Sequence, residues 1–124
     1  MMNELKREAE KYDLSSLINL QKKRRENVGI FEQSIKNERA ASQQEESAQA
    51  NLEAKLRHHD LGLVKLSDAD REWIVSDLPK LKSTREKREQ TIVLLKAAIL
   101  EEQTAMDREE QMINYLEIRN GSKI

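Results

Sequence analysis

The sequence predicts an all-α protein built around a long antiparallel helical hairpin, a coiled coil, and composition and periodicity both support this. Charged residues make up 36% of the chain and aromatic residues only 3%, with one proline and three glycines in 124 residues. Glu, Lys, Gln, Arg, Ala and Leu favour helices, whereas strands favour β-branched and aromatic residues. Apolar residues also recur in heptads over two long segments, which is typical of helices that pack on helices. We expect a single helical domain over residues 1–124.

The segment 1–13 predicts a short helical arm. Leu5, Ala9 and Tyr12 would share one face of a helix, with charged residues around them. Asp13 then favours a new helix start, because a short carboxylate side chain can accept hydrogen bonds from the first N–H groups of a helix. Two roles remain open for this arm: docking on the helices that follow, or staying free as a partner-binding segment.

Residues 14–58 predict the first long helix. Its heptad positions carry large apolar residues near both ends, such as Leu17 and Leu52, and small or polar residues in the middle. Small residues allow a partner helix to come close and to insert larger side chains. We therefore expect this helix to accept the apolar stripe of a second long helix.

Residues 59–77 predict the tip of the hairpin, made of a loop and a short helix over 67–76. Gly62 suits the left-handed cap that often ends a helix. The loop is rich in apolar residues, so we expect it to fold over the end of the helix pair with Trp73 as an anchor. The alternative is that Trp73, Leu63 and Val64 contact a partner protein, because tryptophan is enriched at binding hot spots.

Residues 78–119 predict the second long helix, and 120–124 a loose tail. Pro79 suits a first helical turn, where a missing N–H has no intrahelical partner. The apolar stripe of this helix is wider than one two-helix seam can cover, which favours a closed dimer assembled as a helical bundle. The residues expected to carry self-association are Ile92, Leu95, Ala98, Ile99, Met106, Met112 and Ile113.

Charge predicts the direction of pairing. Both long helices are basic in their early part and acidic in their late part. An antiparallel hairpin sets each basic part against an acidic part, whereas a parallel dimer would stack like charges. Several charged residues also fall on the seam itself, so we expect them either to reach its edge or to be covered by a second copy. These residues are Glu38, Glu45, Arg85, Arg88, Glu102 and Glu109.

Several classes of function have no support in the sequence. The chain has no cysteine, and His58 and His59 are adjacent, so they point apart on a helix and do not chelate together. We expect no metal, no cofactor and no enzyme, because no phosphate-binding loop or catalytic motif occurs. No apolar run approaches the roughly 20 residues of a membrane span. We expect no membrane contact and, by default, a cytoplasmic location.

Two functions remain after these exclusions. The favoured one is a structural or adaptor protein that acts through coiled-coil interaction with another protein and through self-association, with a dimer as the expected oligomer. The alternative is a nucleic-acid-binding accessory protein that uses the basic run Lys22, Lys23, Arg24 and Arg25 together with the basic residues of 80–88. A net charge of −1 gives no overall attraction to nucleic acid, which weighs against the alternative.

Overall fold

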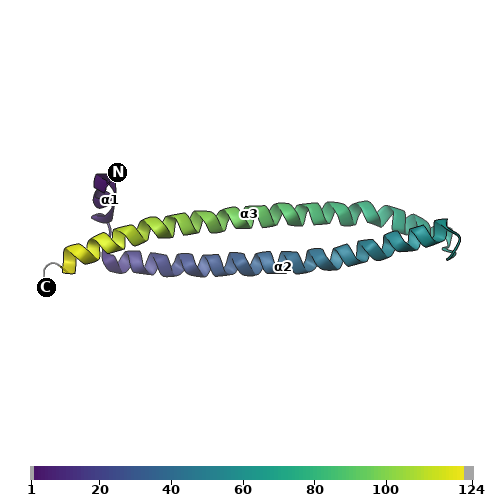
Figure 1. Cartoon of the computed structure of the whole chain (residues 1–124), viewed down its shortest axis with the longest axis horizontal. Helices are drawn as coiled ribbons and strands as arrows, with labels where there is room; N and C mark the ends of the chain where they lie inside the picture. Colours follow the sequence, from purple (N-terminus) through teal and green to yellow (C-terminus); the bar gives the residue numbers. More distant parts are fainter. Residues whose placement is uncertain (1, 122–124) are drawn as a thin grey trace. The chain divides into compact units, whose positions relative to one another are not determined.

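The computed structural model describes residues 2–121, and within them the chain forms three α-helices and no strand (Figure 1). They are α1 (Met2–Ala9), α2 (Leu14–Asp60) and α3 (Asp68–Gly121). The long helices α2 and α3 run antiparallel and pack against each other. The predicted all-α helical hairpin is therefore confirmed.

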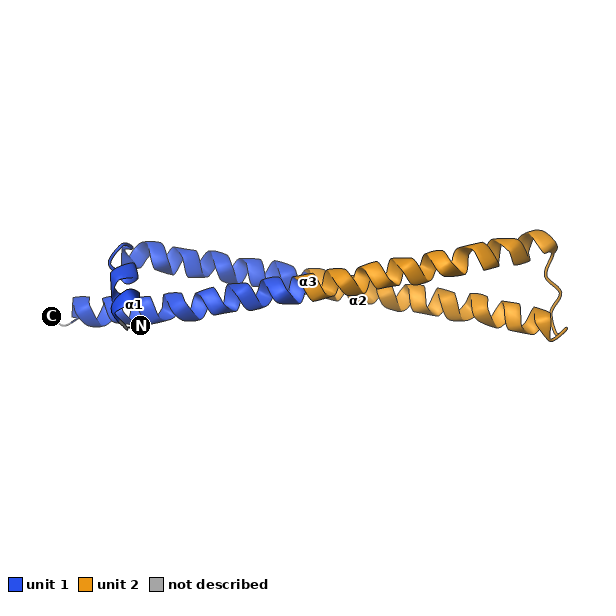
Figure 2. Cartoon of the chain, turned by 90° about the horizontal axis from the view of Figure 1, so that it is seen from above, with its two compact units in different colours: residues 1–33, 95–124 blue, residues 34–94 orange. Residues whose placement is uncertain are grey.

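The chain divides into two compact units, coloured separately in Figure 2. The base unit is Met1–Gln33 with Leu95–Ile124, and the tip unit is Ser34–Leu94. Each unit pairs one part of α2 with one part of α3. The base unit holds α1, and the tip unit holds the loop 61–67 that joins the two long helices.

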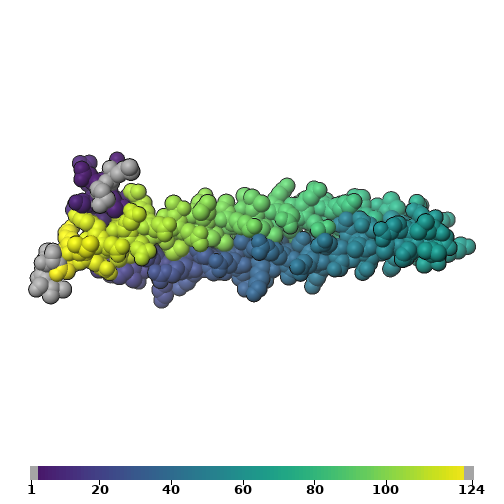
Figure 3. All heavy atoms as spheres, in the orientation of Figure 1, coloured from purple at the N-terminus to yellow at the C-terminus, as the bar shows by residue number. Residues whose placement is uncertain are grey.

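The base unit has a core to which all three helices contribute. Its buried residues are Leu5 and Ala9 of α1, Leu17 of α2, and Met112, Ile113 and Leu116 of α3. The Asp13 carboxylate accepts a hydrogen bond from the Ser16 N–H at 2.7 Å, so it caps α2 as expected. The arm is thus helical and docked, and Figure 3 shows it lying against the late part of α3.

The tip unit closes with the left-handed glycine that the sequence predicts. Gly62 has φ 75°, and its N–H donates to the His59 carbonyl at 3.0 Å. The Leu63 N–H donates to the His58 carbonyl at 2.8 Å, which satisfies another carbonyl at the end of α2. The helix runs to Asp60, two residues past its predicted end.

The predicted break between a short helix over 67–76 and a long helix over 78–119 is wrong. Ser67 caps a helix as expected, but α3 continues through Pro79 to Gly121. Ile74, with 3% of its surface exposed, already belongs to the core of the tip unit. Its burial outweighs the hydrogen bond that Pro79, having no N–H, does not make. Of the predicted tail, Asn120 and Gly121 belong to α3, and 122–124 lie outside the described residues.

The apolar residues of the tip do not cover the end of the hairpin. Leu61 is 70% exposed, Leu63 71% and Trp73 57%, so the predicted anchoring of Trp73 is wrong. Adjacent helical residues point about 100° apart. Because Ile74 takes the inward position, Trp73 is turned toward solvent.

Candidate functional site

In the base unit, the seam between α2 and α3 contains a paired charge cluster. Arg24 Nε donates to both carboxylate oxygens of Glu109, at 2.9 and 2.8 Å, and Arg24 Nη1 donates to Glu102 at 3.3 Å. Glu109 is only 4% exposed. The hydrogen bonds to Glu109, and secondarily those to Glu102, raise the pKa of Arg24, so this guanidinium stays charged. Beside it, Gln21 donates to the Met106 carbonyl at 2.9 Å.

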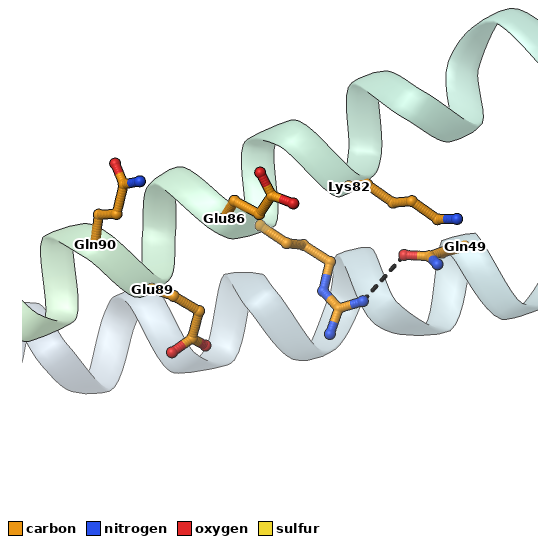
Figure 4. Close-up of a pocket in the computed structure, with 6 residues that line it drawn as sticks. Gln49, Lys82, Glu86, Glu89 and Gln90 are labelled. Atoms are coloured by element: carbon orange, nitrogen blue, oxygen red, sulfur yellow. Dashed lines mark hydrogen bonds between the residues drawn. The ribbon is translucent and has the colours of Figure 1, made fainter.

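The tip unit contains a cluster of the same composition. Arg88 Nε donates to Glu45 at 2.5 Å, and Arg88 Nη1 donates to Glu38 at 3.0 Å. These hydrogen bonds, first to Glu45 and then to Glu38, raise the pKa of Arg88. Next to the cluster, Arg85 donates to Gln49 at 3.0 Å, the bond drawn as a dashed line in Figure 4. Glu45 Oε2 and Arg85 Nε are buried without a hydrogen-bond partner among the described residues.

The two clusters correspond position by position in the sequence. Arg24 and Arg88 are separated by the same number of residues as Glu38 and Glu102, and as Glu45 and Glu109. We call this constant separation the shift. The shift also matches apolar positions, capping positions and others along the chain. Identical pairs include Asp13 and Asp77, Leu14 and Leu78, Leu17 and Leu81, Lys23 and Lys87, Ile35 and Ile99, and Leu52 and Leu116.

Residues 13–52 and 77–116 therefore follow one heptad pattern. The sequence suggested that the seam charges reach the edge of the seam or are covered by a second copy. In the structure they instead pair with each other across the seam. Composition and heptads do not show this pairing. The constant shift in residue number does show it in an antiparallel hairpin. There, a contact of Arg24 on α2 with Glu109 on α3 is matched by a contact of Arg88 on α3 with Glu45 on α2.

The residues expected to carry self-association lie mostly between the helices of the chain itself. Ile92, Met112 and Ile113 are buried, and Leu95, Ala98, Ile99 and Met106 are half-buried. Met112 and Ile113 are covered by α1. The large apolar side chains that α3 leaves exposed are others, namely Trp73, Val75, Val93, Leu94, Leu100 and Ile118.

The residues expected to contact a partner are exposed. Trp73 lies on the outer face of α3, and Leu63 and Val64 lie in the loop 61–67, with 71% and 48% of their surfaces exposed. These three side chains and Leu61 are one part of the apolar surface that the tip unit exposes, and Val75, Val93 and Leu94 of α3 are exposed as well.

The structure splits both basic clusters into seam residues and surface residues. Lys22, Lys23 and Arg25 are exposed on α2, whereas Arg24 turns into the seam. Within 80–88, the lysines are exposed and the two arginines pair with α2. Each cluster therefore presents fewer free cations than its sequence suggests.

The surface depression drawn in Figure 4 is open and lined by charged and amide side chains, including Lys82, Glu86 and Glu89. Over residues 2–121, no group of His, Asp or Glu side chains is arranged to hold a metal ion. In the same range, none of the helices combines the length and apolar character needed to cross a membrane.

Comparison with known proteins finds no matching family model, no matching curated protein and no matching solved structure. The paired seam clusters and the exposed apolar side chains are therefore the features from which a function has to be inferred.

Proposed function

We propose that this protein is a non-enzymatic structural or adaptor protein that acts through coiled-coil association with another protein and with a second copy of itself. The observation that carries the proposal is the set of large apolar side chains left in solvent on α3. Leu100 is 63% exposed and Leu94 is 70% exposed. Burying one such side chain stabilises by roughly 1.5–3 kcal/mol, so several together favour association.

Self-association is tested by measuring mass in solution. We expect light scattering to give twice the chain mass of 14.5 kDa in the micromolar range. If the association uses the exposed face of α3, Leu100→Lys should lower the average mass without loss of helix content by circular dichroism, because Leu100 faces solvent in the single chain. Gln103→Lys, at an exposed polar position of the same helix, is the matched control and should leave the mass unchanged. A stably folded wild-type protein that stays at 14.5 kDa would rule out self-association.

The adaptor role is tested at the tip. Trp73→Ala should remove a specific binding partner in affinity capture from the native source, because tryptophan side chains dominate many protein interfaces. Glu72→Ala is the control, since Glu72 is also exposed but offers no apolar surface. Equal capture by the two variants would exclude Trp73 from the interface.

A second candidate function, nucleic-acid binding, is favoured only by the exposure of Lys22, Lys23 and Arg25. If it holds, the protein binds generic duplex or single strand with micromolar affinity at physiological salt, and the affinity falls steeply as salt rises. Changing these three residues to Glu should abolish that binding. The Arg24 cluster remains intact in this variant, which loses one seam-side hydrogen bond, from Arg25 to Gln21, so its helix content should be checked by circular dichroism.

A further inference from the structure

The loop that closes the hairpin is short, apolar and compatible with a helix. Leu61, Leu63 and Val64 are exposed, and the loop 61–67 contains no proline. The loop is held in its turn by backbone hydrogen bonds to carbonyls at the end of α2 and by the left-handed conformation of Gly62. The Leu66 N–H adds a hydrogen bond to His59 Nδ1 at 3.1 Å.

The heptad pattern of α2 does not stop where α2 stops. Continued past Leu52 and Leu56, the alternating three- and four-residue steps reach His59, Leu63, Leu66 and, after Asp70, Trp73. Leu63 and Trp73 face solvent in the closed hairpin. In a helix that ran on through the loop, Leu63 would join the apolar stripe of α2, whereas Trp73 would stay on the outer face because Ile74 keeps the inward position.

The contacts that hold α2 against α3 do not require both helices to belong to one chain. The Arg24 cluster and the Arg88 cluster each join one helix to the other. Because the second copy carries an identical α3, α2 of one copy can make every seam contact with α3 of the other. Exchange of an identical element is a low-cost route to a dimer.

We propose that the dimer is domain-swapped: residues 61–67 become helical, and α2 of each copy pairs with α3 of the other. This inference rests on the proposed self-association and names its partner, a second copy of this chain. The seam contacts are equal in the closed and swapped forms, and Leu94 and Leu100 stay in solvent in both, so the loop decides between them. Swapping brings the apolar loop residues of the two copies together, whereas closing leaves them in solvent. A fall in mass for Leu100→Lys that Leu63→Lys does not reproduce would overturn the exchange in favour of side-by-side packing.

A pair of charge-reversed variants tests the exchange directly. One variant carries Arg24→Glu and the other carries Glu102→Arg with Glu109→Arg. Each variant alone sets like charges against each other in the base unit. In a swapped heterodimer, the carboxylate introduced into one chain meets the two guanidinium groups introduced into the other, and the second seam keeps its wild-type pairing. After unfolding and refolding as a mixture, we expect a heterodimer by native mass spectrometry and a Tm several degrees above that of either variant alone.

The control is a single chain that carries all three changes, which restores opposite charges within itself. If this chain regains wild-type stability but the refolded mixture melts as two separate variants, the swap is wrong. Self-association by another mode would still stand if the wild-type protein has twice the mass of one chain. A wild-type protein that is monomeric would instead remove both proposals.

Loop variants must shift the dimer fraction in opposite directions. Gly62→Ala should raise it, because alanine disfavours φ 75° and favours a helix, and no atom lies within 4 Å of the added Cβ. Lys65→Pro should lower it, because proline interrupts a continuous helix. Lys65→Ala is the control and should not lower it. Equal dimer fractions in the alanine and proline variants at position 65 would contradict a helical loop.

Discussion

In the base unit a third helix, α1, packs over α2 and α3, whereas in the tip unit the loop 61–67 joins the two helices and leaves its apolar side chains in solvent. The two units follow one sequence pattern but differ in α1 and at seam positions, because Met112 and Ile113 of the base unit correspond to Ala48 and Gln49 of the tip unit. Leu17 in the base unit is completely buried, but its counterpart Leu81 in the tip unit is only half-buried. A leucine at corresponding positions is thus more buried in the unit that contains α1.

The charge clusters show the same contrast. The Glu109 side chain in the base unit is 6% exposed, and the corresponding Glu45 in the tip unit is 16% exposed. Arg24 bonds both carboxylate oxygens of Glu109 and one oxygen of Glu102, whereas Arg88 bonds one oxygen each of Glu45 and Glu38. The base cluster is therefore the more buried of the two, and its loss should lower the free energy of unfolding more.

The largest expected difference between the units is at the paired leucines. Leu17→Ala should lower the free energy of unfolding by about 3 kcal/mol, because it leaves a cavity among fully buried neighbours. Leu81→Ala should lower it by less than half as much, since water already reaches part of that side chain. Urea unfolding followed by circular dichroism measures both. Equal losses would mean that α1 adds nothing to the burial of Leu17.

The next largest difference is at the paired arginines. Arg24→Ala should lower the free energy of unfolding by about 2 kcal/mol, because Glu109 would stay buried without its cation. Arg88→Ala should cost less, because its two glutamates are closer to water. Lys23→Ala, next to the base cluster but exposed, is the control and should cost little. If Arg88→Ala costs more than Arg24→Ala, the ranking of the two clusters is wrong.

The sequence predicted the helices and their direction because those depend on repeated local signals. Heptads locate α2 and α3, Asp13 and Gly62 mark ends that the structure confirms, and the charge gradient selects the antiparallel pairing. Each of these signals acts over a few residues or is summed over a whole helix, so a single unusual residue does not reverse it.

The sequence did not predict features that depend on which distant residues meet. The eight residues of α1 define an apolar face but not its target, so the covering of Met112 and Ile113 was not foreseen. Pro79 obeys a local rule for helix starts that the burial of Ile74 overrides. The charged seam residues looked unfavourable one by one, and only their pairing across the seam explains them.

A smaller difference is expected at the paired aspartates. Asp13→Ala should speed hydrogen exchange in the first turn of α2, because the Ser16 N–H loses its acceptor. The hydrogen bonds from Ser16 lower the pKa of Asp13, because they favour the charged carboxylate. Asp77→Ala should not speed exchange, because Asp77 lies inside α3, where alanine is the better helix former. Faster exchange near Asp77 would indicate a helix start there after all.

The smallest expected effect is release of α1 in acid, which would remove the difference between the units. Glu8 on α1 accepts hydrogen bonds from Arg108 on α3, and these lower the pKa of Glu8, with the charges of Arg108 and Lys11 adding to the shift. A carboxyl group whose pKa is lower in the docked state stabilises docking when it is ionised. That contribution is complete above the ordinary pKa of 4.5 and is lost as the pH falls through the lower docked value.

We therefore expect the NMR signals of Leu5 and Ala9 to move toward undocked positions as the pH falls from about 6 to about 3. Glu8→Gln should weaken docking at neutral pH and flatten most of this dependence, with the remainder coming from Asp13, whose pKa is also lowered. Trp73, the only tryptophan, lies in the tip unit and provides an internal control, because its fluorescence should not change while α1 detaches. If the signals of α1 and Trp73 change together, acid is opening the hairpin rather than releasing the arm. If the Glu8→Gln variant titrates like the wild type, the contact between Glu8 and Arg108 does not hold α1 in place.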